Sequence, residues 1–526
     1  MKSYCVHIVL FILLFFSCFI TTAGASPDTI STGSSYHFWR LITYDNPWLN
    51  QINPAGLSKA GFISSNRAVI SYGYSDKDLI FSQEPGLINS YLAYTEGYTS
   101  IGNVSFYGAF GYHNEHYDRL KYNNTLIFDP SNPYLLGDTI GGRQRKEGYS
   151  LEGSVSVTLS ERISAGLSVH YINSTGAKQK DPRNLNRISS LFAVPGVTFS
   201  TGNLTFGLSA GLERFNNDVM VSVTENAKYN LFQFMGLGYF KSIRNIYSYS
   251  NAYYGSGYRA DFQLGFEKPR FSSFTSAGVR SYTEEVRYGN AKRLLDALSE
   301  TTSISVYSIQ TLKGSKSTHN LEIDFRANFT GGAEINQDYV RIVQGLYSYD
   351  SLVTLSWVDN RHSIDNLTGR LHYRLVRANK SDSQGFEAIA GVAANYFSSK
   401  HFPVENWGFF DVVSLTGNVG FTIPFTPKRG LTLIPDMLGT YRMSLYKDME
   451  YNVQSQSLPE VASTDYQATH YDYLRGDISL TSLINSGKTG ISEYYIKIDY
   501  YRSQPVVSGD ITGRNTGFNL LLGIIF

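Results

Sequence analysis

The sequence predicts an all-β protein, a transmembrane antiparallel β-barrel of about 18 strands, and three observations support this fold class. Segments of about ten residues that alternate polar and apolar side chains recur from residue 63 to the end. The 526 residues include 40 Tyr and 32 Phe, yet the mean hydropathy is −0.20, which suits strands with one lipid-facing and one wet side. Residues 26–526 contain no apolar run of the roughly 20 residues that a membrane helix needs.

Residues 1–25 predict a cleaved secretory signal peptide. A basic residue near the start precedes an apolar run from Val6 to Ile20, and small residues ending at Ala25 follow it. The alternatives are an uncleaved anchor helix and a lipoprotein cut before Cys18. Both cysteines, Cys5 and Cys18, lie in this leader, so a chain cut after Ala25 has no thiol for a disulfide, a metal site or a nucleophile.

The alternating segments run roughly 10 to 14 residues, longer than the usual 5–6 residues of soluble strands. In residues 320–329, for example, apolar side chains at odd positions alternate with Glu322, Asp324 and Arg326. A soluble β-sandwich also alternates, but its filled core would not tolerate unpaired charges of both signs. The pattern therefore favours a barrel over residues 63–526.

The connections alternate in length, which assigns the two sides of the membrane, because bacterial barrels have short periplasmic turns and long external loops. Short turns such as Thr201–Asn203 alternate with long connections near 119–147, 176–189, 215–257, 331–365 and 448–470. With Phe526 in the periplasm, we expect an even number of strands, with 14 or 16 as the alternatives to 18. The expected strands are residues 66–76, 88–98, 103–116, 148–159, 163–174, 190–201, 204–214, 258–267, 272–287, 302–313, 318–329, 368–378, 385–398, 409–424, 431–446, 472–484, 491–502 and 514–526.

The last strand carries a membrane-insertion signal. Its apolar side chains fall on one face and end in a terminal aromatic residue, which resembles the signal read by the barrel-assembly machinery of outer membranes. We expect that machinery and the membrane lipid as partners. The residues of this signal are Gly517, Phe518, Leu520, Leu522, Ile524 and Phe526.

Residues 26–62 do not alternate and precede the first strand, so we expect a periplasmic segment there. Its two Asn-Pro pairs predict a loop or short helix. The residues that define it are Asn46, Pro47, Trp48, Asn53, Pro54, Ala55, Gly56 and Leu57.

The five residues Asn53–Leu57, NPAGL, resemble an element of the fatty-acid-transporter superfamily of barrels. That superfamily includes hydrocarbon-uptake channels and the shuttle proteins of type IX secretion. The resemblance implies a hatch that tucks into the lumen; the alternative is a turn that caps the lumen without gating. The expected strand number departs from the fourteen customary in that superfamily. The long Tyr- and Asn-rich loops resemble uncharacterised outer-membrane barrel families of Gram-negative Bacteroidota.

The polar faces of the late strands predict the lining of the lumen. Two interpretations stay open: the charges line a water-filled path and select solutes, or they pair across strands and narrow the interior. Mixed signs favour pairing. The candidate residues are Glu322, Asp324, Arg326, Arg370, His372, Arg374, Arg475, Asp477, Lys497 and Asp499.

The sequence gives little sign of catalysis, so we expect no enzyme and no cofactor. His113 and His116 are the nearest approach to a metal cluster, but a spacing of three puts them on opposite faces of a strand. No motif of a hydrolase or nucleotide-binding protein stands in a suitable context. The 45 basic and 44 acidic residues give no electrostatic case for nucleic acid.

Three functions remain as hypotheses for a barrel in the outer membrane. The first is a channel or transporter-like barrel for a small solute or lipophilic compound, with residues 26–62 as a hatch. The second is a non-conducting accessory barrel that binds a TonB-dependent transporter, a secretion system or an assembly complex through its long loops. The third and remotest is an outer-membrane hydrolase.

Overall fold

The computed structural model describes residues 46–59, 64–224, 230–244, 247–289, 293–344, 347–377, 385–402, 408–488, 491–506 and 513–526. The predicted signal peptide and residues 26–45 of the N-terminal segment lie outside these ranges. So do the domain boundaries predicted near residues 25 and 62.

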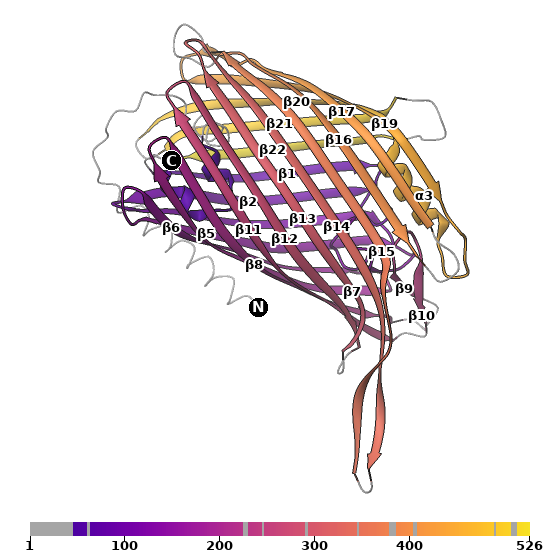
Figure 1. Cartoon of the computed structure of the whole chain (residues 1–526). Helices are drawn as coiled ribbons and strands as arrows, with labels where there is room; N and C mark the ends of the chain where they lie inside the picture. The colour runs from indigo at the N-terminus through magenta and orange to yellow at the C-terminus, as the bar shows by residue number, and fades with distance from the viewer. Residues whose placement is uncertain are drawn as a thin grey trace. The chain divides into compact units, whose positions relative to one another are not determined.

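Eighteen long strands form one closed antiparallel barrel (Figure 1). Each strand pairs with the next along the chain, and β22 closes the ring on β1, where Phe526 and Asn66 exchange two backbone hydrogen bonds. The barrel strands are β1 (Ser65–Lys77), β2 (Leu87–Ile101), β3 (Val104–Leu120), β5 (Gly142–Thr158), β6 (Ile163–Lys178), β7 (Arg183–Thr201), β8 (Leu204–Ser222), β11 (Ser248–Lys268), β12 (Phe271–Tyr288), β13 (Leu294–Lys313), β14 (Ser317–Gln344), β15 (Tyr347–Arg377), β16 (Glu387–His401), β17 (Gly408–Thr422), β19 (Leu431–Glu450), β20 (Tyr473–Lys488), β21 (Ile491–Pro505) and β22 (Asn515–Ile525).

The predicted strand number and fold class are confirmed, but the predicted outer ends were too short. Residues 331–344 and 347–365, expected as part of a loop, continue β14 and β15 as a paired two-stranded ribbon that projects beyond the barrel (Figure 1). The strands β7, β8, β11 and β13 likewise extend several residues into the predicted external loops. Backbone pairing does not need lipid, so the strands continue beyond the band of outward apolar side chains.

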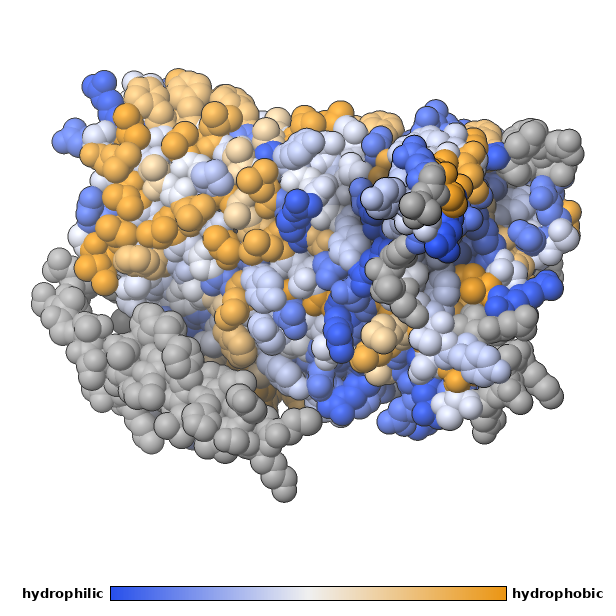
Figure 2. Space-filling model, turned by 90° about the horizontal axis from the view of Figure 1, so that it is seen from below, coloured by the Kyte–Doolittle hydropathy of each residue, from blue (hydrophilic) through white to orange (hydrophobic). Residues whose placement is uncertain are grey.

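The two faces of the wall follow from the register, because directly paired residues of an antiparallel ladder lie on the same face. Phe518, Leu520, Leu522 and Ile524 of the predicted insertion signal pair with Tyr74, Tyr72, Ile70 and Ala68 of β1, which forms an apolar outer face, while Gly517 lies on the inner face. In Figure 2 apolar surface gathers over one half of the wall and hydrophilic surface over the other. A closed barrel with an apolar exterior satisfies every backbone group within a bilayer, and the protein is an outer-membrane β-barrel.

Several smaller elements accompany the barrel strands. Within the described ranges, none of the helices has both the length and the apolar character to cross a membrane. β4, β9 and β10 form a separate three-stranded sheet, and β18 pairs with β19. These elements are η1 (Pro47–Asn50), η2 (Pro54–Lys59), β4 (Leu136–Gly137), β9 (Leu231–Phe234), β10 (Phe240–Ile243), β18 (Phe425–Lys428) and α3 (Pro459–His470).

Candidate functional site

The N-terminal segment, residues 46–59, contacts the wall on opposite sides of the ring and therefore lies inside the barrel. On one side the Trp48 indole meets the Phe274 ring of β12 edge-on, with centroids 4.9 Å apart. On the other side Leu49 packs against a cluster that includes Val69 of β1, Leu483 of β20 and residues of β19, β21 and β22. The segment thus crosses the lumen near the end that carries the short turns.

Asn53 fixes this segment to the wall. Its buried side-chain amide donates to the carbonyl oxygens of Val197 (3.0 Å) and Leu208 (3.4 Å) and to Gln263 Oε1 (2.9 Å). Its Oδ1 accepts from the Ala55 backbone N–H (3.0 Å), which shapes the turn into η2. The Asn53-Pro54 pair therefore has a definite local role. Pro54 disfavours a helical conformation at Asn53, and the Asn53 side chain forms hydrogen bonds in place of the absent helical backbone hydrogen bonds.

Glycines on the inner wall make room for this segment. A Cβ at Gly166 would lie 2.8 Å from the Ala55 nitrogen, and one at Gly196 would overlap Asn53 Oδ1 and lie 3.0 Å from Pro54 Cδ. Farther along the segment, Lys59 Nζ donates to Ser200 Oγ (2.8 Å), and burial lowers the pKa of this amine. Close backbone approach of this kind is what glycine in a strand allows.

The ten predicted lining residues all lie on the inner face. Gln263 contacts Asn53 and so points inward, and the cross-strand register carries that face around the ring to β14, β15, β20 and β21. Most of these residues contact one another or a neighbour. Arg475 and Asp477 pair at 2.6 Å, and Lys497 and Asp499 pair at 2.9 Å.

The predicted lining residues on β14 and β15 form further contacts. Asp324 forms an ion pair with Arg326 at 3.1 Å, and its carboxylate lies 4.0 Å from the Arg370 guanidinium. His372 contacts the side-chain nitrogen of Asn418 (3.0 Å) and stands opposite Glu322 in the register.

Arg374 forms the most buried of these pairs, a two-pronged contact with Glu387 (2.7 and 3.1 Å). Sequence reasoning missed Glu387 because it stands at the start of β16, where the alternation is too short to assign a face. It also missed an inner pair on β11, Arg259 with Asp261 (2.7 Å), although these residues alternate with Tyr258 and Phe262 and could have been found.

The opposite end of the lumen is closed by long connections that fold inward. Residues 121–137 run along the inner wall, where a row of buried amide side chains donates to their carbonyl oxygens. Asn184 and Asn186 both donate to the Asn124 oxygen (2.7 and 2.9 Å), and Asn217 donates to the Thr125 oxygen (3.0 Å). Sequence reasoning placed this loop outside the barrel, because nothing in a single sequence marks a loop as folding inward.

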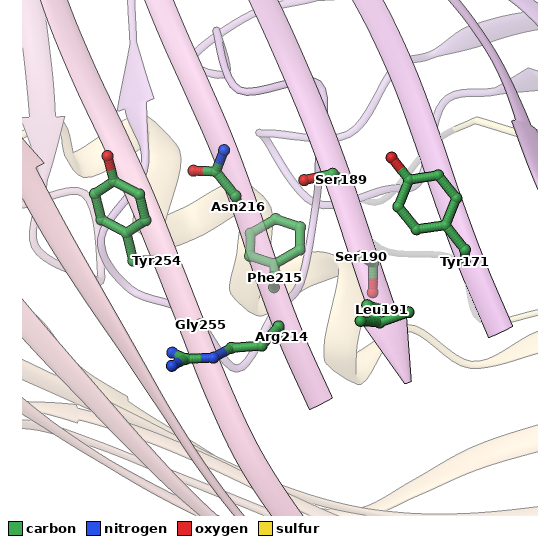
Figure 3. Close-up of a pocket in the computed structure, with 9 residues that line it drawn as sticks. All are labelled: Tyr171, Ser189, Ser190, Leu191, Arg214, Phe215, Asn216, Tyr254 and Gly255. Carbon is green, nitrogen blue, oxygen red and sulfur yellow. The ribbon is translucent and has the colours of Figure 1, made fainter. Parts of the chain in front are cut away.

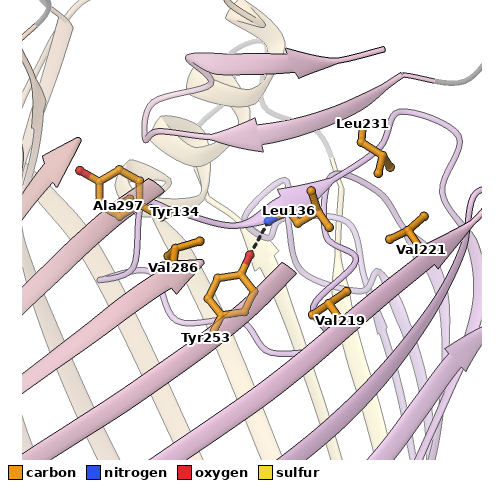
Figure 4. Packing of buried hydrophobic residues seen from close by; sticks show 8 residues of the cluster. All are labelled: Tyr134, Leu136, Val219, Val221, Leu231, Tyr253, Val286 and Ala297. Atoms are coloured by element: carbon orange, nitrogen blue, oxygen red, sulfur yellow. Dashed lines mark hydrogen bonds between the residues drawn. The ribbon is translucent and has the colours of Figure 1, made fainter. Parts of the chain in front are cut away.

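A buried apolar cluster holds β4 and β9 against the same side of the wall. Leu136 and Leu231 pack on Val219, Val221, Tyr253, Val286 and Ala297, side chains from β8, β11, β12 and β13. Figure 4 shows these wall residues meeting the two inward strands, and the Leu136 backbone N–H donates to the Tyr253 hydroxyl (2.9 Å).

The other edge of this closure reaches the far wall. Tyr239, which precedes β10, is stacked with the His401 ring (centroids 4.7 Å apart) and with the Tyr451 ring (5.2 Å). With Leu237 it packs against Phe410 and Val412 on β17. We call residues 121–141 and 230–244 together the outer closure, and it spans the lumen from β8 and β11–β13 to β17.

Helix α3 buttresses the outer closure. Val461 packs on Phe232 and Phe234 of β9, and Glu460 accepts a hydrogen bond from the Tyr122 hydroxyl (2.5 Å). Asp465 accepts from the Ser82 backbone N–H (2.7 Å), and burial raises the pKa of its carboxyl to about 7.

A cavity of about 180 Å³ lies beneath the inward loop, on the lumen side of β8 and β11–β13. Its wall is polar: Glu284 accepts from the Asn132 amide (2.5 Å) and the Tyr282 hydroxyl (2.9 Å), and Arg280 binds Glu213 (2.6 Å). The cavity therefore presents paired polar and charged side chains to the lumen.

His113 and His116 point to opposite faces, and His113 contacts Ser174 Oγ at 3.2 Å on the inner face. No group of three potential metal-ligating side chains occurs within the described residues.

Comparison with known proteins adds a family. The sequence matches the Family of unknown function (DUF6850) over residues 54–526. The chain belongs to this family. The match begins at Pro54, so in this DUF6850 protein it includes η2 and all 18 barrel strands.

Solved structures similar to this DUF6850 chain include the outer membrane transporter YddB from Escherichia coli (9% identity, 88% of this chain and 81% of that chain, TM-score 0.38). Another is BauA, the ferric preacinetobactin receptor from Acinetobacter baumannii (9% identity, 88% and 80%, TM-score 0.38). A third is the RagAB peptide transporter (6% identity, 88% and 86%, TM-score 0.42). No curated protein matches the sequence.

Proposed function

We propose that this barrel is a closed passage across the outer membrane for a small solute or lipophilic compound, with the N-terminal segment as its hatch. The observation that carries the proposal is that two separate parts of the chain cross the lumen from wall to wall, one near each end. Between them the inner wall carries charged side chains such as Asp499, whose side chain keeps about a third of its surface exposed. A polar interior between two closures suits a lumen that a solute enters transiently better than a lumen filled permanently by side chains.

The two closures differ in how firmly they are held, which supports assigning the hatch to the N-terminal segment. Among the described residues, five side-chain hydrogen bonds join that segment to the wall, three of them from Asn53. At about 1 kcal/mol each, these contribute at most roughly 5 kcal/mol, because the two amide hydrogens of Asn53 are shared among three acceptors, and the apolar contacts of Trp48 and Leu49 add to them. The outer closure rests on larger apolar clusters and on α3. The resemblance of Asn53–Leu57 to the hatch element of other barrels agrees with this division.

Conductance in planar lipid bilayers tests the proposal with four proteins: wild type, a chain lacking residues 26–62, Tyr239→Ala, and both changes combined. Because either closure alone blocks the lumen, we expect low conductance for the wild type and for each single change. We expect high conductance only when both changes are combined. Tyr258→Ala, an exposed tyrosine on the outer face of β11, is the matched control for Tyr239→Ala. A combined variant that stays silent excludes an aqueous path, and a wild type that conducts as well as the combination shows that the closures do not block.

A second candidate function, an accessory barrel that binds an outer-membrane partner, is supported by the projecting ribbon of β14 and β15. Its outer part exposes Val343, Tyr347 and Leu355, and Tyr347 is 80% exposed. A two-stranded ribbon is marginally stable in water by itself, which favours a bound partner. Affinity purification in mild detergent of wild type and of a chain lacking residues 336–356 tests this function. A TonB-dependent transporter, secretion or assembly component retained only by the wild type supports it, and a monomer in both cases contradicts it.

A further inference from the structure

The outer face of the barrel carries a shallow pocket over β6, β7, β8 and β11, separate from the lumen and its closures. Its volume is about 230 Å³. Figure 3 shows the polar ends of Tyr254, Asn216, Ser189 and Tyr171 along one side of the pocket and the Arg214 guanidinium on the other. In the register Ser189 pairs with Asn216, and Asn216 pairs with Tyr254, so these side chains share the outer face.

The pocket lies where the apolar band of the wall ends toward the external loops. On β8 the outward residues Leu204, Leu208 and Leu212 are exposed apolar side chains, and Leu212 is 64% exposed. The next outward residue is Arg214, followed by Asn216. The polarity therefore changes from hydrocarbon to headgroup character at Arg214, on the side of the membrane that faces the exterior.

Within the described residues Arg214 forms no ion pair, and neither does Arg187 on the outward face of β7, whereas three other cations on this outward surface are paired. Arg145 pairs with Glu147 (3.2 Å), Arg287 with Glu285 (2.8 Å), and Arg293 with Asp218 (2.7 Å). Within the described part of the chain, no ion pair or hydrogen bond involves the exposed guanidinium of Arg214. A cation at the edge of the hydrocarbon layer is unfavourable unless a lipid headgroup or water satisfies it.

We propose that this pocket binds the phosphate-bearing headgroup of an amphiphile in the outer leaflet. The Arg214 guanidinium supplies a planar, permanently charged donor that matches phosphate geometry. The hydroxyls of Tyr171 and Tyr254 already accept hydrogen bonds from Asn173 (3.3 Å) and Arg293, and each keeps its proton to donate to the rest of the headgroup. The apolar tail then lies along Leu212 and Leu208, so one ligand contacts both the polar pocket and the apolar band of the wall.

Native mass spectrometry of the full-length protein tests this site with a phosphorylated glycolipid and the same glycolipid after removal of its phosphates. The proposal predicts one saturable bound molecule of the phosphorylated form, and an affinity lowered about tenfold by Arg214→Ala, the loss expected from one charge-assisted hydrogen bond. Arg214→Lys keeps the charge and should bind with intermediate affinity. Arg287→Ala, which removes a paired cation from the same face, is the matched control.

Three outcomes overturn the proposal. Equal binding of the dephosphorylated glycolipid means that the pocket does not recognise phosphate. Full displacement by millimolar inorganic phosphate means that it is an anion site with no preference for an amphiphile. An unchanged affinity in Arg214→Ala, in a protein whose gel mobility shows a folded barrel, means that the lipid binds elsewhere.

Discussion

Replacing Gly196 by alanine should release the N-terminal segment without disturbing the barrel wall. The three atoms nearest to a Cβ at this position belong to Asn53 and Pro54, with none from a neighbouring strand. Asn53 Oδ1 would have to move by about 1 Å to avoid the overlap, given ordinary van der Waals distances. That shift breaks or lengthens the donated hydrogen bonds of the Asn53 amide, which now measure 2.9–3.4 Å.

The size of the effect follows from those hydrogen bonds. Losing two or three of them at about 1 kcal/mol each lowers the free energy of docking by about 2 to 3 kcal/mol. A change of 1.4 kcal/mol is tenfold, so the undocked fraction should rise by about 30- to 150-fold. Gly153→Ala is the matched control, because a Cβ there meets no atom within 4 Å.

Thiol labelling measures this release. Both native cysteines precede residue 19, so a leader-free chain with Leu57→Cys carries one thiol at a position that is 5% exposed when docked. The labelling rate by a maleimide should rise by the factor above in Gly196→Ala and stay unchanged in Gly153→Ala. Equal rates in the two variants would refute the assignment of Asn53 as the anchor.

Two further predictions concern the outer closure and the wall. Because burial raises the pKa of Asp465 from 3.8 to about 7, the docked state binds more protons between these values, so docking of α3 weakens as the pH rises through this window. Hydrogen exchange of residues 459–470, corrected for intrinsic rates, should show more opening at pH 8 than at pH 5.5, and Asp465→Asn should remove the difference. Arg374→Ala leaves Glu387 buried without its main partner and should lower stability by about 3 to 5 kcal/mol. Arg326→Ala removes an exposed guanidinium and leaves Asp324 close to Arg370, so it should change stability by less than about 1 kcal/mol in the same urea titration.

The barrel was predictable from the sequence because successive side chains of a strand point alternately to the lipid and to the lumen. Leu321, Ile323 and Phe325 alternate with Glu322 and Asp324 along one strand, and the structure keeps that alternation. The short turns marked the strand ends on their side of the barrel to within a few residues.

The closures were not predictable in the same way. Asn53 binds Gln263, 210 residues away in the chain, and Asn124 binds Asn184 and Asn186, 60 and 62 residues away. No local period encodes such contacts, and the glycines that admit the hatch look like ordinary strand glycines in sequence. The ribbon at 336–356 could have been predicted, because Tyr347, Tyr349, Val353 and Leu355 of β15 alternate with Ser348, Asp350 and Thr354.

The most direct test of the account is the accessibility of the middle of the lumen from outside the cell. A thiol at Asp499→Cys, on the inner face of β21, is probed on intact cells with a membrane-impermeant maleimide, and Ser348→Cys on the exposed ribbon serves as the positive control. The account predicts that residue 348 reacts at once and that residue 499 reacts only after Tyr239→Ala loosens the outer closure. Rapid labelling of residue 499 in the otherwise native protein would contradict a closed chamber, and no labelling even after Tyr239→Ala would contradict a passage.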